Sequence, residues 1–196
     1  MPAGRPRAFD ADRALGAAAE VFWKHGYEGA SLDLLTAAMG INRPSLYGAF
    51  GDKADLFEKA VARYQETYFL PNLRALTQAP NLAAGIAAYL AASLRLVAGD
   101  KTPKGCLIAN VLVDAAEANA RWRTLMAAIS AEGRAALTSA VQKFAPQNRA
   151  KRIANLLVVG VPGLAVLARS GASAAELAAS SEAIGAACLA LGIKDA

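Results

Sequence analysis

The sequence is poor in the residues on which most enzyme and metal sites depend. Of its 196 residues, one is a histidine, His25, and two are cysteines, Cys106 and Cys188. A single histidine excludes, within one subunit, both a serine–histidine–aspartate triad and a multi-histidine metal site. Two cysteines so far apart are too few for a disulfide framework and offer no metal-binding pair. The sequence also has no glycine-rich phosphate loop and no carboxylate cluster, so we expect a protein without catalytic residues, metal or cofactor.

Long uninterrupted apolar runs are absent as well. The first residues, MPAGRPRAFDADRALG, contain no continuous apolar segment and therefore do not form a signal peptide. The most membrane-like stretch, residues 153–168, contains Asn155 and a Gly-Val-Pro-Gly break. It is shorter than the roughly 20 apolar residues that a membrane span requires. We therefore expect a cytoplasmic protein that has no membrane partner, with this stretch forming a buried helix.

Charged residues make up only 19% of the chain, whereas 55% of the residues are apolar, which is ample for a core and for part of a subunit interface. The net charge is +5, but residues 1–53 carry six basic and six acidic side chains, so the excess lies in residues 54–196. The total charge therefore gives weak support for nucleic-acid binding, and the positions of individual cations matter more.

The pattern of apolar residues predicts an all-α fold, because no run alternates as a strand does. Gly26 should end the first helix, and Pro71 should end or kink a long helix near Phe69. Two short helices are expected between residues 31 and 53. The other helices are expected at about 10–25, 53–78, 82–98, 105–117, 120–144, 147–170 and 174–191.

Residues 31–53, SLDLLTAAMGINRPSLYGAFGDK, predict two short helices joined by a tight turn. Ser31 and Asn42 are candidate N-caps, and Gly40 supplies the left-handed conformation that ends the first helix. Pro44 lies in the first turn of the second helix, where its missing N–H costs nothing. The residues expected on the outer face are Arg43, Ser45, Tyr47 and Gly48. A short helix with this polar, small-residue face suits insertion into a DNA major groove.

Over about residues 9–61 the chain resembles the TetR-type transcriptional regulators. Three elements occur in the order found in that family: a first helix ending in HGYEGAS, the turn MGINRPSLY, and FGDKADLF at the start of a long connecting helix. The resemblance implies a helix-turn-helix DNA-binding domain with a basic N-terminal arm at residues 1–53. It also implies a helical effector-binding and dimerisation domain at residues 54–196.

The candidate DNA contacts follow from this arrangement. Arg43 can hold guanine through O6 and N7, a bidentate contact worth about 1–3 kcal/mol of discrimination. Tyr47 and Lys53 are expected to hold phosphates, as the corresponding positions do in the family, and Ser31 can do so from a helix N-terminus while also capping it. The remaining candidates are Pro44, Ser45 and Gly48 on the second helix and Arg5 and Arg7 on the arm. The arm either enters the minor groove, follows the backbone or stays solvated.

The last two expected helices contain LLVVGVPGLAVLA and ELAASSEAIGAACLAL and are apolar around most of their circumference. Such helices must be buried, either within one subunit or in a four-helix interface between two subunits. We favour the interface, because a groove-reading module usually needs a two-fold partner to match a palindromic site. The expected partners are therefore a palindromic double-stranded DNA operator and a second copy of the chain bound through these helices.

The effector-binding residues are the least determined part of the prediction. A mostly apolar cavity between the central helices could be lined by Tyr64, Tyr68, Tyr89, Cys106, Trp122 and Met126. For each of them taken singly we favour ordinary core packing. The predicted function is a dimeric, sequence-specific transcriptional regulator, a repressor that an unknown small molecule releases from DNA.

Two alternatives remain. Cys106 follows Lys104 at the expected start of a helix, and both features favour the reactive thiolate form. Some family members with a similar Gly-Cys-Leu segment respond to electrophiles or oxidants, so the chain could be a redox- or electrophile-sensing repressor acting through Cys106. We favour an inert cysteine, since free cysteine is commonly buried. The alternative of another class is a small helical enzyme or carrier whose N-terminal pattern is incidental.

Overall fold

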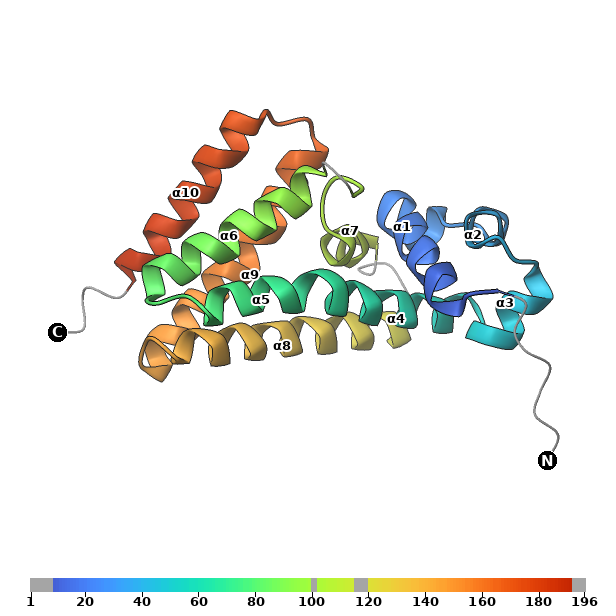
Figure 1. The fold of residues 1–196 in the computed structure, drawn as a ribbon, viewed down its shortest axis with the longest axis horizontal. Helices are drawn as coiled ribbons and strands as arrows, with labels where there is room; N and C mark the ends of the chain where they lie inside the picture. The colour runs from blue at the N-terminus through green and yellow to red at the C-terminus, as the bar shows by residue number, and fades with distance from the viewer. Residues whose placement is uncertain (1–8, 100–101, 115–119, 192–196) are drawn as a thin grey trace.

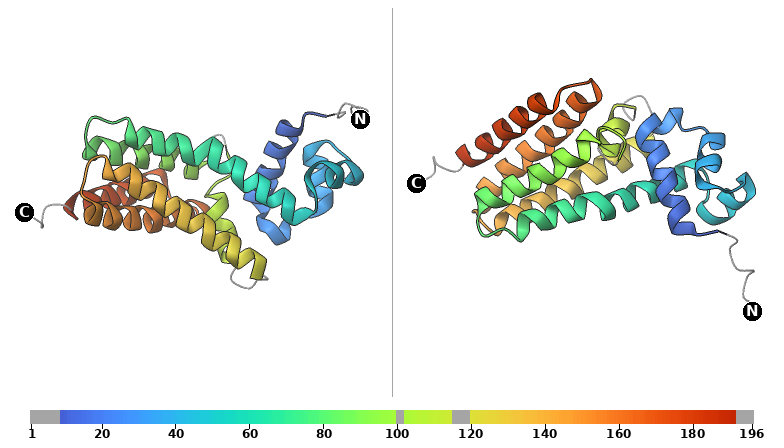
Figure 2. Two further views of the ribbon diagram at one scale, coloured as in Figure 1. Left: turned by 90° about the horizontal axis from the view of Figure 1, so that it is seen from below. Right: turned by 45° about the horizontal axis from the view of Figure 1, so that its top comes forward.

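A computed structural model describes residues 9–99, 102–114 and 120–191, with side chains described outside residues 112–122. All the regular elements in these ranges are helical, which confirms the predicted all-α fold (Figure 1). The helices are α1 (Ala11–Gly29), α2 (Leu32–Met39), α3 (Arg43–Phe50), α4 (Lys53–Tyr64), the π-helical η1 (Gln65–Phe69), α5 (Leu70–Thr77), α6 (Leu82–Ala98), α7 (Leu107–Asp114), α8 (Ala120–Gln142), α9 (Gln147–Arg169) and α10 (Ala174–Ala190). Helices α1 to α3 lie at one end of an elongated molecule, and α10 lies towards the other (Figure 2).

The two short helices begin and end where the local sequence predicts. The Ser31 hydroxyl accepts a hydrogen bond from the Leu34 N–H, and the Asn42 side chain accepts one from Ser45. Gly40 ends α2 in the left-handed conformation, with φ of 66°. Caps of this kind are typically worth about 1 kcal/mol each, which matters for helices of only two turns. The local sequence therefore fixes the residues at which α2 ends and α3 begins.

The helices α4, η1 and α5 form one continuous rod (Figure 1). Pro71 lies in the first turn of α5 and cannot donate a backbone hydrogen bond. The rod accommodates it by widening to a π-helical turn over Gln65–Phe69, in which the Leu70 N–H bonds to the Gln65 carbonyl. The predicted disruption near Phe69 is therefore a change of helix type, and the chain continues in the same direction.

Two large clusters of buried side chains hold the fold together. The first joins α1, α2, α3 and α4 and also takes in Leu107 and Val111 of α7 and Met126 of α8. The second is formed by α5, α6, α8, α9 and α10. Helix α4 thus packs with the N-terminal helices although all but its first residue lie beyond residue 53. The division into residues 1–53 and 54–196 stays a prediction about function, because the packing is shared across it.

Helix α9 exposes an apolar face that the described chain does not cover. Val159 is 72% exposed, Val166 58% and Leu167 40%. Gly163 lies on the same face, because Val159, Gly163, Val166 and Leu167 occupy positions i, i+4, i+7 and i+8 of the helix. Among the described helices, α9 is the one whose length and composition would allow it to cross a membrane. Buried core helices of proteins without membrane spans meet the same criterion. Helix α9 packs against α6, α8 and α10 with its other faces.

Candidate nucleic-acid interface and ligand cavity

Helix α3 divides into a buried face and an exposed face as the sequence predicts. Leu46 and Phe50 are buried, whereas Arg43 and Gly48 are exposed and Tyr47 is 49% exposed. Pro44 is also exposed, and Ser45 is partly buried. A Cβ atom added at Gly48 would meet nothing within 4 Å, so the fold itself does not require glycine there. This small residue instead leaves the exposed surface of α3 open to a close partner.

Arg43 has a partner that the sequence analysis missed. Its Nη2 donates a hydrogen bond to Oδ1 of Asp33, in the first turn of α2, at 2.8 Å. This hydrogen bond, together with the charge of Asp33, raises the pKa of the Arg43 guanidinium. A guanidinium has five N–H donors, so it can keep this contact and still present a fork to another acceptor. Asp33 thus orients Arg43 across the turn between the two helices.

Lys53, at the start of α4, lies against an aromatic ring. Its Nζ is 4.5 Å from the centroid of the Tyr27 ring, a cation–π geometry. Partial burial lowers the pKa of Lys53, and the nearby charge of Glu28 opposes that shift. Behind it, Lys59 donates a hydrogen bond to the carbonyl of Phe50 at 2.9 Å and ties the end of α3 to α4. Of the other candidates, Ser31 is exposed, and Arg5 and Arg7 lie outside the described residues.

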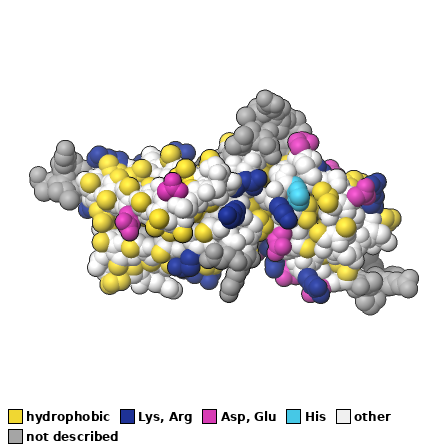
Figure 3. Space-filling model, turned by 90° about the horizontal axis from the view of Figure 1, so that it is seen from above, with side chains coloured by type: hydrophobic (Ala, Val, Ile, Leu, Met, Phe, Trp, Pro, Cys, Tyr) yellow, Lys and Arg dark blue, Asp and Glu magenta, His cyan; other side chains and the backbone are white. Residues whose placement is uncertain are grey.

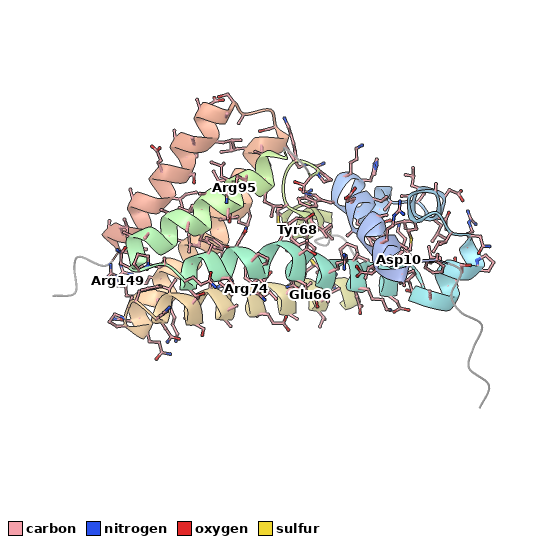
Figure 4. All side chains as sticks on the ribbon, in the orientation of Figure 1. Asp10, Glu66, Tyr68, Arg74, Arg95 and Arg149 are labelled. Atoms are coloured by element: carbon pink, nitrogen blue, oxygen red, sulfur yellow. The ribbon has the colours of Figure 1, made fainter. Side chains whose placement is uncertain are left out.

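A mostly apolar cavity of about 150 Å³ lies between the rod and helices α6, α8 and α9. Tyr64, Tyr89 and Cys106 line it, whereas Met126 and Tyr68 do not. Met126 is buried in the N-terminal cluster. Tyr68 projects from η1 towards α1, where its ring meets the ring of Trp23 edge-on at 5.4 Å (Figure 4). The side chain of Trp122 lies outside the described residues.

The sequence analysis missed most of the cavity's walls. The other lining residues on which our argument depends are Phe69, Asn72, Ser93, Gly133 and Arg134. Ser93 is a buried polar residue one turn after Tyr89 on the apolar α6, which is a signal that could have been recognised in the sequence. Gly133 and Arg134 on α8 carried no comparable signal, because they face the cavity only through the packing of four helices.

A few polar groups converge on the cavity. The Tyr64 hydroxyl donates a hydrogen bond to Sγ of Cys106 at 3.2 Å, and Asn72 donates one to the Ser93 hydroxyl at 3.5 Å. Burial raises the pKa of both Tyr64 and Tyr89, so each phenol stays neutral at physiological pH. Neutral phenols and hydroxyls both donate and accept hydrogen bonds. The cavity therefore suits a mostly apolar molecule with a small number of polar atoms.

Cys188 is fully buried in the second cluster, and burial raises the pKa of its thiol to about 11. In the part of the chain that the structure describes, no three histidine, cysteine, aspartate or glutamate side chains are grouped as a metal site.

Comparisons with known proteins connect this geometry to a family. The sequence profile of the bacterial regulatory proteins, tetR family, matches residues 14–60. The HTH-type transcriptional repressor ComR of Escherichia coli K12 is 30% identical over 186 residues, which is 89% of this chain and 86% of ComR. A cysteine variant of the TetR-family regulator CifR, solved with a 26-base-pair operator DNA, superposes with a TM-score of 0.83. It is 32% identical, and the match covers 94% of this chain and 99% of CifR.

A TetR regulator from Chloroflexus aurantiacus, at 23% identity and a TM-score of 0.75, shares the fold over 89% of this chain and 91% of its own. The matched profile spans α1 to most of α4, the same helices that form the N-terminal cluster.

Proposed function

Because the chain belongs to the TetR family of bacterial transcriptional regulators, we propose that it is a dimeric, cytoplasmic repressor that releases its operator when a small molecule binds. The exposed face of α3 is the observation that carries this proposal, since it presents Arg43, Tyr47 and Gly48 on a helix held by caps. The operator complex of CifR, a relative of similar length, supports it.

In this proposal α3 enters the major groove of a half-site. Arg43, oriented by Asp33, reads a guanine through its free donors, and Gly48 lets the backbone approach the bases. Tyr47 and Lys53 hold phosphates on either side, and the N-terminus of α2 at Ser31 holds another. Arg5 and Arg7 remain candidates for contacts from the arm.

Two copies of the chain would pair through α9 and α10. The exposed stripe of Val159, Gly163, Val166 and Leu167 is the surface that a second copy would cover. A Cβ added at Gly163 meets nothing within 4 Å in one subunit, so its small size is available for the close approach of a second helix. Pairing would place two α3 helices one DNA turn apart, roughly 34–36 Å.

Selection of bound duplexes from a random DNA pool tests the proposed function directly. We expect the purified chain to enrich a palindromic sequence whose two half-sites lie about 10 base pairs apart, measured from centre to centre. Enrichment of no sequence at physiological ionic strength would contradict sequence-specific binding. Catalytic turnover without specific DNA binding would instead favour the helical enzyme or carrier.

The effector would bind in the cavity between the rod and α6, α8 and α9. A dry apolar cavity of about 150 Å³ accepts a molecule the size of benzene, so we propose a compact ligand built on one ring or a short chain. Tyr64 belongs to both the cavity wall and α4, the helix that begins at Lys53. A ligand that prefers one position of this rod would change the separation of the two α3 helices.

Filling the cavity from Gly133 should block ligand binding without disturbing the fold. A Cβ added at Gly133 meets nothing within 4 Å, so Gly133→Phe can place its ring in the cavity. With millimolar benzene as the probe, the thermal unfolding midpoint of the wild-type protein should rise, as expected for a ligand of the folded state. Gly133→Phe should abolish this rise, whereas the control Gly133→Ala should keep it. An equal rise in both variants would place the benzene elsewhere.

A thiol-sensing repressor is a second candidate function, favoured by one observation. Sγ of Cys106 lines the cavity and accepts a hydrogen bond from the buried Tyr64 hydroxyl, so modification of the thiol would act on the rod. Alkylation of the native protein by iodoacetamide should weaken binding to the selected duplex about tenfold or more, because the adduct would occupy the cavity and displace the Tyr64 hydroxyl from the sulfur.

Cys106→Ser should bind the duplex normally and resist the reagent. The buried Cys188 should stay unlabelled and serve as the internal control. Labelling of Cys106 that leaves DNA binding unchanged would end the sensor hypothesis.

A further inference from the structure

A groove lined by cations separates α1 from the turn before α7. Its cationic or titratable lining residues are Lys24 and His25 on α1, Lys104 in the turn, and Arg169 at the end of α9. Glu20 is the one carboxylate among the described residues that line it, and the hollow measures about 840 Å³. Figure 3 shows several Lys and Arg side chains gathered around the single histidine at the waist of the molecule. The groove is separate from the apolar cavity.

Arg169 is held in place beside this groove. Its aliphatic part crosses Gly105, where an added Cβ would come within 2.8 Å of Cδ of the arginine. Its Nη1 lies 3.4 Å from the Trp23 carbonyl, which also accepts a shorter hydrogen bond of 3.0 Å from Asn110. The long contact uses one of five N–H donors, so the guanidinium keeps most of its capacity for another acceptor. Arg169 is therefore a preorganised cation.

Helix ends explain some of these cations but not all of them. Cations are favoured near the C-terminal end of a helix, where the dipole is negative. That accounts for Arg169 at the end of α9. Lys104 comes shortly before the N-terminal end of α7, where the same rule makes a cation unfavourable. An anion bound between Lys104 and the other cations would offset the unfavourable interaction of Lys104 with the dipole of α7.

We propose that this groove binds a small organic anion with two or more charged oxygen groups, either phosphates or carboxylates. Lys24 and His25 would hold it from α1, Lys104 from the turn before α7, and Arg169 from the end of α9. The bound anion would link α1 to the turn before α7 and so stabilise the position of these two segments relative to each other. This inference concerns binding and stability and does not depend on the proposed DNA-binding function.

Isothermal titration calorimetry at low ionic strength tests the site, with pyrophosphate and citrate as the probes. We expect saturable binding of one anion per subunit, with a dissociation constant of about 1 mM or below. Lys24→Gln/Lys104→Gln should weaken it about tenfold, because it removes two of the cations that hold the anion. Both lysines are exposed, so the variant should keep the wild-type circular dichroism spectrum. Binding of only one probe would distinguish a phosphate ligand from a polycarboxylate.

The matched control, Arg74→Gln/Lys151→Gln, removes two exposed positive charges that do not line the groove. It should bind the anion as the wild type does. Equal weakening in the two double variants would show a non-specific charge effect and overturn the proposal. An absence of saturable binding to both probes would overturn it as well and leave the cations a role at helix ends only.

Discussion

Val159→Asp/Val166→Asp is expected to yield a folded monomer that no longer holds its operator. Both side chains are exposed on one face of α9, so aspartate there costs the isolated subunit little. In a dimer the same positions would bury facing carboxylates against apolar surface, which is strongly unfavourable. A monomer contacts only one half-site and therefore lacks the gain of bivalent binding, so we expect operator affinity to fall about 10²- to 10⁴-fold.

Light scattering after gel filtration and fluorescence anisotropy with the selected duplex measure the two effects. The control Leu70→Asp changes an exposed apolar side chain on α5, away from α9 and α10. It should leave the oligomeric state and the operator affinity unchanged. A double aspartate variant that remains a dimer would place the interface elsewhere.

Arg43→Ala and Lys53→Ala should separate sequence reading from phosphate binding. Loss of a bidentate guanine contact costs about 1–3 kcal/mol at one base pair, so Arg43→Ala should relax the preference at that position alone. Lys53→Ala should weaken binding to all duplexes and reduce the slope of log affinity against log salt by about one. Competition binding with duplexes changed at single positions, repeated over a range of salt concentrations, measures both.

Arg43→Lys is the matched control, because it keeps the charge and loses the planar fork. It should retain affinity for random DNA and lose the preference, as the alanine variant does. A Lys53→Ala variant with an unchanged salt slope would contradict the assignment of Lys53 to a phosphate.

Exposed apolar surface on α9 shows where sequence reasoning needed the structure. Apolar residues around most of its circumference indicated burial, and the sequence left open whether the cover came from the same subunit. The structure covers Ile153, Leu157 and Leu164 within the chain and leaves Val159, Val166 and Leu167 uncovered. This distribution supports an interface with a second copy. Which faces of α9 are covered within one subunit depends on the angles at which α6, α8 and α10 cross it, and the sequence does not specify these angles.

The cavity illustrates the same limit more sharply. The sequence analysis offers six residues for the walls of the cavity, and the structure places Tyr64, Tyr89 and Cys106 there. Tyr64 and Tyr68 both pack edge-on against Trp23, at 5.0 and 5.4 Å, yet only Tyr64 also lines the cavity, because Tyr68 lies within the π-helical turn, which shifts the face that each residue occupies. Neither the type of turn nor its consequence is visible in the apolar periodicity.

By itself the sequence determined the short-range features: the helical class, the caps at Ser31 and Asn42, and the exposed face of α3. Each depends on interactions within about four residues, which local chemistry fixes. Tertiary structure alone decided the contacts between distant segments. The Trp23 carbonyl meets Asn110 and Arg169 across 87 and 146 residues, and Arg43 meets Asp33 across the turn. Such pairs depend on how whole helices pack, and helical periodicity specifies which face is buried without specifying what lies against it.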